Sequence, residues 1–414
     1  MEKVYIIGIS MTKFGKLFSY SYKDLTRLAV EEALGDAGIT KELIDVIYFS
    51  NVGQGLINGQ HSVRGQVALR PLGFEEIPVI NVENACASAS TALNQAINFL
   101  KAGEGEFALA VGVEKMYKSP QEKDFEIFNT AWDVETPKEN METLMQLGEG
   151  YQVPESFTKA KRYSMFMDVY ASFARFHMKT FGTTQHQIAA VAAKNHQNSV
   201  HNPLSQYQKP FTIEEVLNAA PIVYPFTLPM CSPVSDGAAA AIVCTESGLK
   251  RLAFNRDRSV EVLTSVIQTG STRKPEEVEK HLTAIAAKKA YEKAGVGPED
   301  ISVAEVHDAT AIGEIIQVEN LGFCHFGEGG FRSEKGEFSL SGRLPVNPSG
   351  GLESKGHPIG ATGLAQIYEL VVQLRGEAGQ RQIAKPTIAL AENGGGVYGI
   401  EEAVASITIL KNNK

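Results

Sequence analysis

The sequence contains two copies of one helix–turn–strand unit, and this repeat limits the possible folds more than any other feature. Residues 25–49 and 282–306 align without a gap. In each copy, apolar residues recur at helical spacing, the helix ends at an Ala-Gly pair, and a short acidic turn leads into an apolar strand. Identical positions include Leu25/Leu282, Thr26/Thr283, Ala29/Ala286, Ala33/Ala290, Ala37/Ala294 and Gly38/Gly295. The repeat predicts two similar α/β halves.

A second, weaker pair of segments extends the repeat. A helix of small residues that begins near Cys86 precedes a strand at 107–112, and a helix that begins at 360–363 precedes a strand at 387–391. We therefore expect an N-terminal half over residues 1–275 and a C-terminal half over residues 276–414. The first half carries an insertion at about 115–215. This insertion is either a lid or partner surface or, for most of its residues, ordinary helical core packing.

The composition excludes several classes of protein. The 414 residues include 39 Lys or Arg and 48 Asp or Glu, giving a net charge of −9 without a basic block, which argues against a nucleic-acid-binding protein. No apolar run is long enough to span a membrane, and the first ten residues resemble a strand rather than a signal peptide. We therefore expect a cytoplasmic protein. Four scattered cysteines are too few for a disulfide framework or a zinc site, so we expect no metal in this chain.

Cys86 is the first candidate for chemistry. It follows a probable strand at 79–82 and precedes the helix of small residues, so it lies where free N–H groups and the helix dipole favour a thiolate. The alternative is a buried, inert thiol, which is a common fate of a free cysteine. Cys231, Cys244 and Cys324 are interpreted as structural thiols.

Three further candidates lie on loops that follow strands or are rich in glycine. His357 stands between Gly356 and Pro358 in the glycine-rich stretch 347–363, where the backbone can approach a ligand closely. His307 directly follows the repeated strand, at the end from which open α/β sheets present catalytic groups. Its neighbour Asp308 is expected to cap a helix that begins near Thr310.

The segment Asn393-Gly394-Gly395 follows the last repeated strand. Its consecutive glycines indicate either a turn whose N–H groups face a reacting oxygen or simply a tight bend. Each of the other histidines lacks a surrounding motif, and we interpret them as surface or core residues.

Together, one cysteine and two histidines in two similar halves resemble the thiolase superfamily. Residues 355–363 resemble the thiolase histidine loop, and residues 235–239, Ser-Asp-Gly-Ala-Ala, also match. The His307-Asp308 pair and the segment at 202–204 resemble the sterol-carrier-protein, or lipid-transfer, branch. The resemblance implies a five-layer αβαβα fold with two pseudo-symmetric halves, and a tight homodimer.

The resemblance also implies roles for the candidate residues. Cys86 would be the acylated nucleophile, His357 its base, and His307 a donor to the thioester oxygen of an enolate. The loop Asn393, Gly394 and Gly395 would face that enolate, and Ser354 and Gly356 would contact coenzyme A. The implied reaction is CoA-dependent thiolytic cleavage of a 3-oxoacyl-CoA, or the reverse Claisen condensation, through an acyl-cysteine.

The sequence departs from the family at one place. Many thiolases carry a second catalytic cysteine in a Cys-x-Gly loop, where this chain has Asn393, and the lipid-transfer branch can place it after His-Asp, where this chain has Ala309. The proton for the enolate could come from His307, His357, Tyr398, a water or another residue. This departure leaves open a retro-aldolase acting on a 3-hydroxyacyl-CoA, a decarboxylating condensing enzyme, or a non-catalytic acyl-carrier or scaffold subunit.

Some thiolases of this branch act only with a small OB-fold/zinc-ribbon protein, and the sequence lacks a basic cluster that would grip coenzyme A, which suits such a partner. The benzoylsuccinyl-CoA thiolases are two-component enzymes of this kind. A bulky substrate of that type would need a roomy pocket beneath the insertion.

Overall fold

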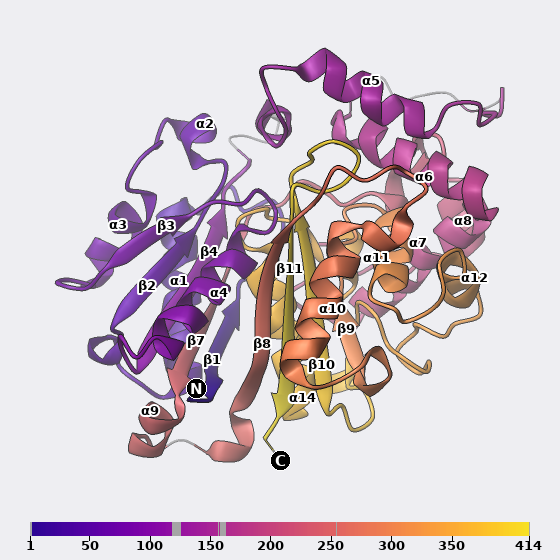
Figure 1. The fold of residues 1–414 in the computed structure, drawn as a ribbon. Helices are drawn as coiled ribbons and strands as arrows, with labels where there is room; N and C mark the ends of the chain where they lie inside the picture. Colours follow the sequence, from indigo (N-terminus) through magenta and orange to yellow (C-terminus); the bar gives the residue numbers. More distant parts are fainter. Residues whose placement is uncertain (1, 118–125, 156, 158–162, 254, 414) are drawn as a thin grey trace.

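The computed structural model describes residues 2–117, 126–155, 157, 163–253 and 255–413. Its strands are β1 Val4–Met11, β2 Val46–Ser50, β3 Val79–Val82, β4 Phe107–Glu114, β5 Pro221–Val223, β6 Phe226–Thr227, β7 Gly237–Thr245, β8 Val260–Thr269, β9 Val303–Glu305, β10 Ile388–Gly395 and β11 Val404–Asn412. Within these described residues, β5 and β6 form a small hairpin and the other strands form one sheet, in the order β3-β2-β4-β7-β1-β8-β11-β10-β9 (Figure 1).

The sheet consists of two similar halves that meet where β1 pairs with β8. Outward from this junction, β1 is followed by β7, β4 and β2, and β8 is followed by β11, β10 and β9. In both series the first two pairings are antiparallel and the third is parallel. The predicted two-half architecture is confirmed. β8 belongs to the second series, although it precedes the predicted boundary at residue 275.

The helices also follow the repeat. The α-helices are α1 Tyr22–Ala37, α2 Gln54–Asn58, α3 Arg64–Leu69, α4 Ser88–Lys101, α5 Pro137–Leu147, α6 Phe166–Phe181, α7 Gln185–Ser199, α8 Ile213–Leu217, α9 Glu246–Arg251, α10 Leu282–Ala294, α11 Ala311–Asn320, α12 Gly329–Glu334, α13 Gly351–Lys355 and α14 Thr362–Arg375. The equivalent helices α1 and α10 end at Gly38 and Gly295, both in the left-handed conformation with φ near +65° that glycine adopts most easily. The predicted repeat units are therefore present.

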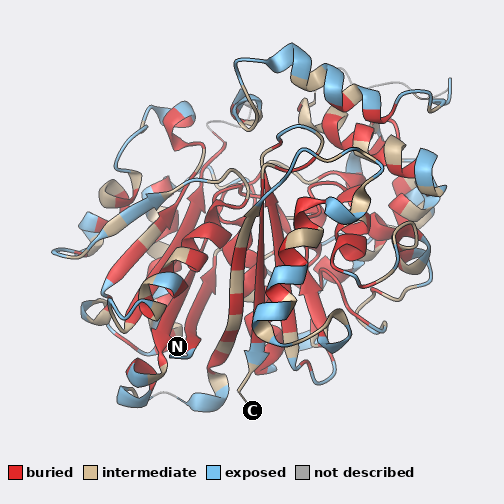
Figure 2. Ribbon diagram, viewed as in Figure 1, coloured by how far each residue is buried: buried red, intermediate tan, exposed pale blue. Residues whose placement is uncertain are grey.

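Five layers result from this arrangement. The central helices α4 and α14 share one apolar core with strands of both halves, for example through Leu93 and Leu370 with Val4 and Val262. On the outer faces, α1 packs against the first half and α10 packs against the second. Most strands are buried, whereas the edge strand β3 and the outer helices expose part of their surface (Figure 2). Small side chains at Ala89, Ala92 and Ala96 let α4 lie close to its neighbours.

The predicted insertion at 115–215 forms α5, α6 and α7, and part of it lies outside the described residues. α6 and α7 pack on α11 through a core that includes Ala174, Ile188 and Ile315. In Figure 1 these magenta helices lie over the C-terminal half. Core packing thus accounts for much of the described insertion, and a lid role stays a prediction.

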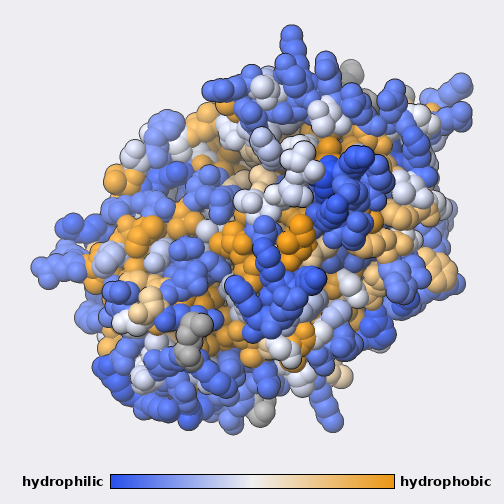
Figure 3. Space-filling model, in the orientation of Figure 1, coloured by the Kyte–Doolittle hydropathy of each residue, from blue (hydrophilic) through white to orange (hydrophobic). Residues whose placement is uncertain are grey.

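The face seen in Figure 3 is mostly hydrophilic, with hydrophobic residues gathered toward its middle. Among the described residues, no helix combines the length and the apolar character needed to cross a membrane.

Candidate active site

The carboxyl ends of the parallel strands bring the predicted residues together. Cys86 follows β3, His307 follows β9, and His357 lies on the loop between α13 and α14. The Nε2 atom of His357 lies 3.3 Å from the Sγ atom of Cys86. The rings of His307 and His357 meet edge to face with their centroids 5.2 Å apart. One Cys86 sulfur and one nitrogen from each histidine lie within 4.8 Å of one another.

The backbone around Cys86 is tightly constrained. The preceding residue, Ala85, has φ +47°, a left-handed conformation that is unfavourable for alanine and is held here by surrounding contacts. Its N–H donates to the side chain of Glu83, and the hydroxyl of Ser88 accepts from the N–H of Asn84. A Cβ atom on Gly395 would lie 2.4 Å from the carbonyl oxygen of Asn84, so only glycine allows this approach.

Burial determines the protonation state of Cys86. It raises the pKa of the thiol to about 12, and the charges of Glu114 and Glu83 act in the same direction, against a hydrogen bond from the backbone of Gly396. Of the two alternatives that the sequence left open, the free protein therefore holds a buried neutral thiol, because burial outweighs the helix N-terminus. Burial also lowers the pKa of His357 well below its ordinary value. The two groups form a neutral thiol–imidazole pair.

The hydrogen bonds of His357 make it the base for Cys86. Its Nδ1 atom lies 2.7 Å from the hydroxyl of Thr362, and that hydroxyl donates its own proton to the carbonyl of Pro358. Nδ1 must therefore carry the ring proton and donate it to Thr362. The lone pair of Nε2 then faces Cys86. The sequence did not single out Thr362, although it lies five residues after the histidine in the same glycine-rich stretch.

His307 has the opposite tautomer. The amide nitrogen of Asn393 donates to its Nδ1 atom at 3.0 Å, and the hydroxyl of Ser90 fixes the amide by donating to Asn393 Oδ1 at 2.8 Å. Nε2 must therefore carry the hydrogen and serve as the donor for a ligand. Burial lowers the pKa of His307 to about 4, so the ring is a neutral donor at neutral pH.

Residues 393–395 do not form the predicted turn or bend after the strand: they end β10 and pair with residues 404–406 of β11, and their roles also differ from the prediction. Asn393 positions His307 rather than facing the enolate with its own amide. Gly395 lines the cavity, as predicted, and Gly396 lines it as well although the sequence did not indicate it. Gly394 instead makes room for a side chain, because an added Cβ would lie 3.0 Å from Cγ of Glu402.

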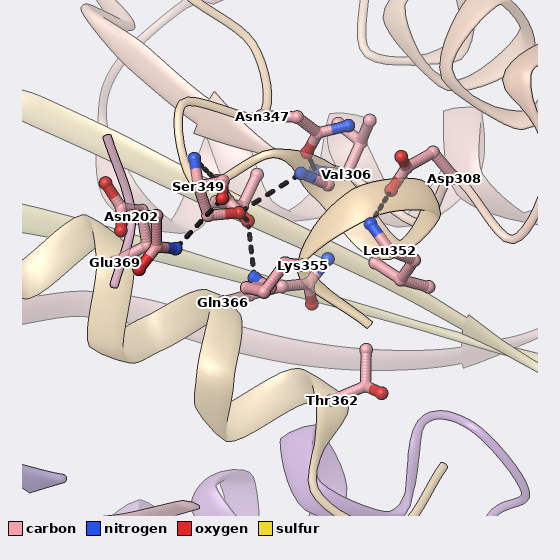
Figure 4. Close-up of polar contacts among 12 residues, drawn as sticks. Asn202, Val306, Asp308, Asn347, Ser349, Leu352, Lys355, Thr362, Gln366 and Glu369 are labelled. Carbon is pink, nitrogen blue, oxygen red and sulfur yellow. Dashed lines mark hydrogen bonds and ion pairs between the residues drawn. The ribbon is translucent and has the colours of Figure 1, made fainter. Parts of the chain in front are cut away.

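A buried polar network holds the histidine loop in place (Figure 4). Lys355 is completely buried and pairs with the buried carboxylate of Glu305 at 3.0 Å. Asp308 accepts from the N–H of Leu352 at 2.7 Å, in the first turn of α13. The prediction that Asp308 caps the helix starting near Thr310 is therefore wrong, because its carboxylate points to α13 instead.

Ser354 and Gly356, the predicted contacts for coenzyme A, are both enclosed by protein. The hydroxyl of Ser354 lies 2.6 Å from that of Ser199. Gly356 has φ +113°, and an added Cβ would lie 2.8 Å from the hydroxyl of Ser235. Neither residue offers a surface to a cofactor, so the prediction of direct contact is wrong for this structure. Ser235 instead accepts the backbone N–H of His357 at 2.9 Å, and thereby helps to fix the catalytic loop.

Cys86, His307 and His357 open into a cavity of about 220 Å³. Its wall includes the aromatic side chains of Phe128, Phe166 and Tyr170, two of them from α6. Such a wall suits an apolar acyl group. Cys231 also lines the cavity, whereas Cys244 is buried in β7, so Cys231 is less remote from the chemistry than the sequence indicated.

Comparisons with known proteins agree with this geometry. The model of the thiolase N-terminal domain matches residues 4–218, and the model of the thiolase C-terminal domain matches residues 265–411. The chain is 37% identical to the acetyl-CoA acetyltransferase of Methanothermobacter thermautotrophicus, over 96% of this chain and 98% of that protein. It is 36% identical to bovine (Bos taurus) sterol carrier protein 2, over 99% of this chain and 72% of that protein.

Solved structures share the fold. A structure described as an Ltp2-ChsH2(DUF35) aldolase matches with a TM-score of 0.75 and 20% identity, covering 100% of this chain and 98% of the other. Human mitochondrial 3-ketoacyl-CoA thiolase in complex with CoA matches with a TM-score of 0.69 and 17% identity, covering 100% of this chain and 98% of the other. On its sequence matches over nearly the whole length, with the Cys-His-His site in place, this chain belongs to the thiolase family.

Proposed function

We propose that this protein is an acyltransferase that catalyses CoA-dependent thiolytic cleavage of a 3-oxoacyl-CoA, or the reverse Claisen condensation, through an acyl-cysteine at Cys86. The observation that carries the proposal is the 3.3 Å approach of the unprotonated Nε2 of His357 to the sulfur of Cys86. A base placed at hydrogen-bonding distance from a neutral thiol creates the nucleophile at the moment of attack.

The site residues divide the reaction between them. His357 takes the proton of Cys86 as the sulfur attacks the 3-oxo carbon of the substrate. The C–C bond then breaks and leaves an enolate, whose thioester oxygen accepts a hydrogen bond from Nε2–H of His307. The thiol of coenzyme A next attacks the acyl group on Cys86 and releases the second product. Here coenzyme A is a co-substrate.

The assembly belongs to the same proposal. We infer a homodimer because β3 is an edge strand that pairs only with β2 among the described strands, and Ile80 on it is exposed. A second, small OB-fold/zinc-ribbon subunit is supported by the aldolase neighbour, whose description pairs Ltp2 with ChsH2(DUF35). Light scattering of the protein with and without that subunit tests both inferences. A monomer in all conditions contradicts the dimer, and an unchanged mass on addition of the subunit contradicts the complex.

The reaction is tested by incubating the protein with a panel of 3-oxoacyl-CoA thioesters and free CoA, with and without the small subunit. We expect CoA to be consumed and two acyl-CoA products to form, and Cys86→Ser to abolish both. The same panel in the 3-hydroxy form tests the alternative. Cleavage of 3-hydroxyacyl-CoA without consumption of CoA, retained in Cys86→Ser, would establish a retro-aldolase instead.

A further inference from the structure

The turn between β10 and β11 places a carboxylate in the wall of the active-site cavity. Glu402 lines the same cavity as Cys86, His307 and His357, and it is the only carboxylate that does so among the described residues. The turn is shaped by hydrogen bonds from the N–H of Ala403 to Gly395 and from that of Tyr398 to Glu401. Gly394 leaves the space that the Glu402 side chain needs.

Two side chains from the C-terminal half hold the Glu402 carboxylate. Its Oε1 accepts from the amide of Gln317 at 3.0 Å, and its Oε2 lies 3.3 Å from Nε2 of His281. Nδ1 of His281 accepts from the N–H of Thr283 and faces the amide nitrogen of Asn320, so the ring hydrogen is on Nε2, the nitrogen that lies nearer to Glu402.

The charge on Glu402 follows from these contacts. Burial raises the pKa of Glu402, whereas His281 and the local backbone lower it, and the lowering influences prevail. The adjacent Glu401 does not line this cavity: it pairs with Arg273 at 2.5 Å and lies 4.0 Å from Nε2 of His281. Glu402 is therefore an ionised carboxylate that is anchored through Oε1, while Oε2 accepts no hydrogen bond from the described residues.

The reaction needs one proton-transfer group beyond those already assigned. His357 serves the sulfur of Cys86, and His307 has a hydrogen on Nε2 while Asn393 occupies its other nitrogen. The positions where relatives carry a second cysteine hold Ala309 and Asn393. A group must nevertheless remove the proton from the α-carbon in condensation and return it in cleavage.

Resting on the function proposed above, we propose that Glu402 is the acid–base residue that exchanges this α-carbon proton, and that His281 and Gln317 are its positioning residues. In condensation, Glu402 takes a proton from the α-carbon of an acyl-CoA, and the C–H electron pair becomes the enolate. The enolate carbon bonds to the acyl carbon on Cys86 and the C–S bond breaks. The released thiolate is protonated through His357, which passes on the proton that Glu402 removed. Cleavage runs through the same steps in reverse.

The test separates C–C chemistry from acyl transfer in Glu402→Gln. Formation of acyl-Cys86 from a simple acyl-CoA such as acetyl-CoA involves no α-carbon proton, and intact mass detects it directly. Cleavage of a 3-oxoacyl-CoA requires that proton. We expect Glu402→Gln to slow cleavage by about 10²–10⁴-fold while it slows acyl transfer by less than about tenfold. Glu279→Gln, an exposed carboxylate that does not line this cavity, is the control and should retain both activities.

A further readout is specific to proton transfer. Wild-type protein in D₂O should place deuterium on the α-carbon of acetyl-CoA, and Glu402→Gln should not, while Glu402→Asp restores part of the exchange. Equal exchange in wild type and Glu402→Gln would overturn the proposal, as would equal loss of acyl transfer and cleavage in a variant with an unchanged melting temperature. Absence of an acyl adduct on wild-type Cys86 would contradict the proposed function itself and this inference with it.

Discussion

Removing the charge of Lys355 tests whether the histidine loop depends on a buried ion pair. Lys355 and Glu305 are both fully buried with 3.0 Å between their charged atoms, and Glu305 also accepts from the N–H and hydroxyl of Ser349. Lys355→Met leaves the carboxylate buried without its cation. Breaking such a pair costs about 3–5 kcal/mol. We therefore expect the free energy of unfolding at pH 8 to fall by that amount.

The pH dependence gives this prediction its sign. Burial already raises the pKa of Glu305 in the folded protein, and Lys355 opposes that rise. Without Lys355 the pKa of folded Glu305 rises further. Above the unfolded pKa of about 4.5, keeping Glu305 buried therefore lowers the free energy of unfolding. This loss disappears at a pH low enough to protonate Glu305 in both the folded and the unfolded state. Urea unfolding at pH 8 and pH 5 should show a smaller penalty at pH 5.

The control is Lys280→Met, which removes an exposed ion pair with Glu277. Because exposed pairs contribute about 0–1 kcal/mol, this variant should unfold almost as the wild type does. A Lys355→Met penalty below about 1 kcal/mol, or one that is the same at pH 8 and pH 5, would refute the reasoning.

Three other outcomes follow from the site. His357→Ala should slow acylation of Cys86 by about 10²–10⁴-fold in single-turnover mass spectrometry, and unchanged acylation would remove it as the base. In Asn393→Leu, His307 loses the hydrogen bond that keeps its ring hydrogen on Nε2, so the rate of cleavage should fall by about 10²–10³-fold. The rate of alkylation of Cys86 by iodoacetamide should stay within a few-fold of the wild-type rate. A variant that cleaves as fast as the wild type would contradict the donor role of His307. Because burial lowers the pKa of His307 to about 4 and that of His357 well below its ordinary value, both rings stay neutral as the pH falls past 6.5. The acid limb of kcat/KM should therefore lie below pH 6, and a limb at 6.5 would refute it.

The sequence predicted the architecture because the repeat is local and periodic. Helical spacing and Ala-Gly helix ends determine α1 and α10, and both recur with the same spacing before β2 and β9. The two halves of the sheet then have the same order of strands, because each copy of the repeat places its strand and helix in the same way. Cys86, His307 and His357 were identifiable because thiols and imidazoles are rare and each lies beside a strand end or among glycines.

The partners of these residues were not predictable in the same way. Ser90 and Asn393, which set the tautomer of His307, are 303 residues apart in sequence and meet only through packing of the two halves. Glu402 stands in a Glu-Glu pair that resembles an exposed turn, and only its contacts with His281 and Gln317 reveal that it is buried. The sequence could not decide between a thiolate and a neutral thiol at Cys86, because position at a helix start does not reveal how deeply the thiol is buried.

The central claim is that Cys86 carries the acyl group during turnover. The most direct measurement is intact mass of the protein mixed rapidly with a 3-oxoacyl-CoA in the absence of free CoA, followed by peptide mapping. We expect an adduct equal to the acyl fragment on the peptide that contains Cys86, its removal on addition of CoA, and no adduct in Cys86→Ala. Turnover without any adduct, undiminished in Cys86→Ala, would contradict the account.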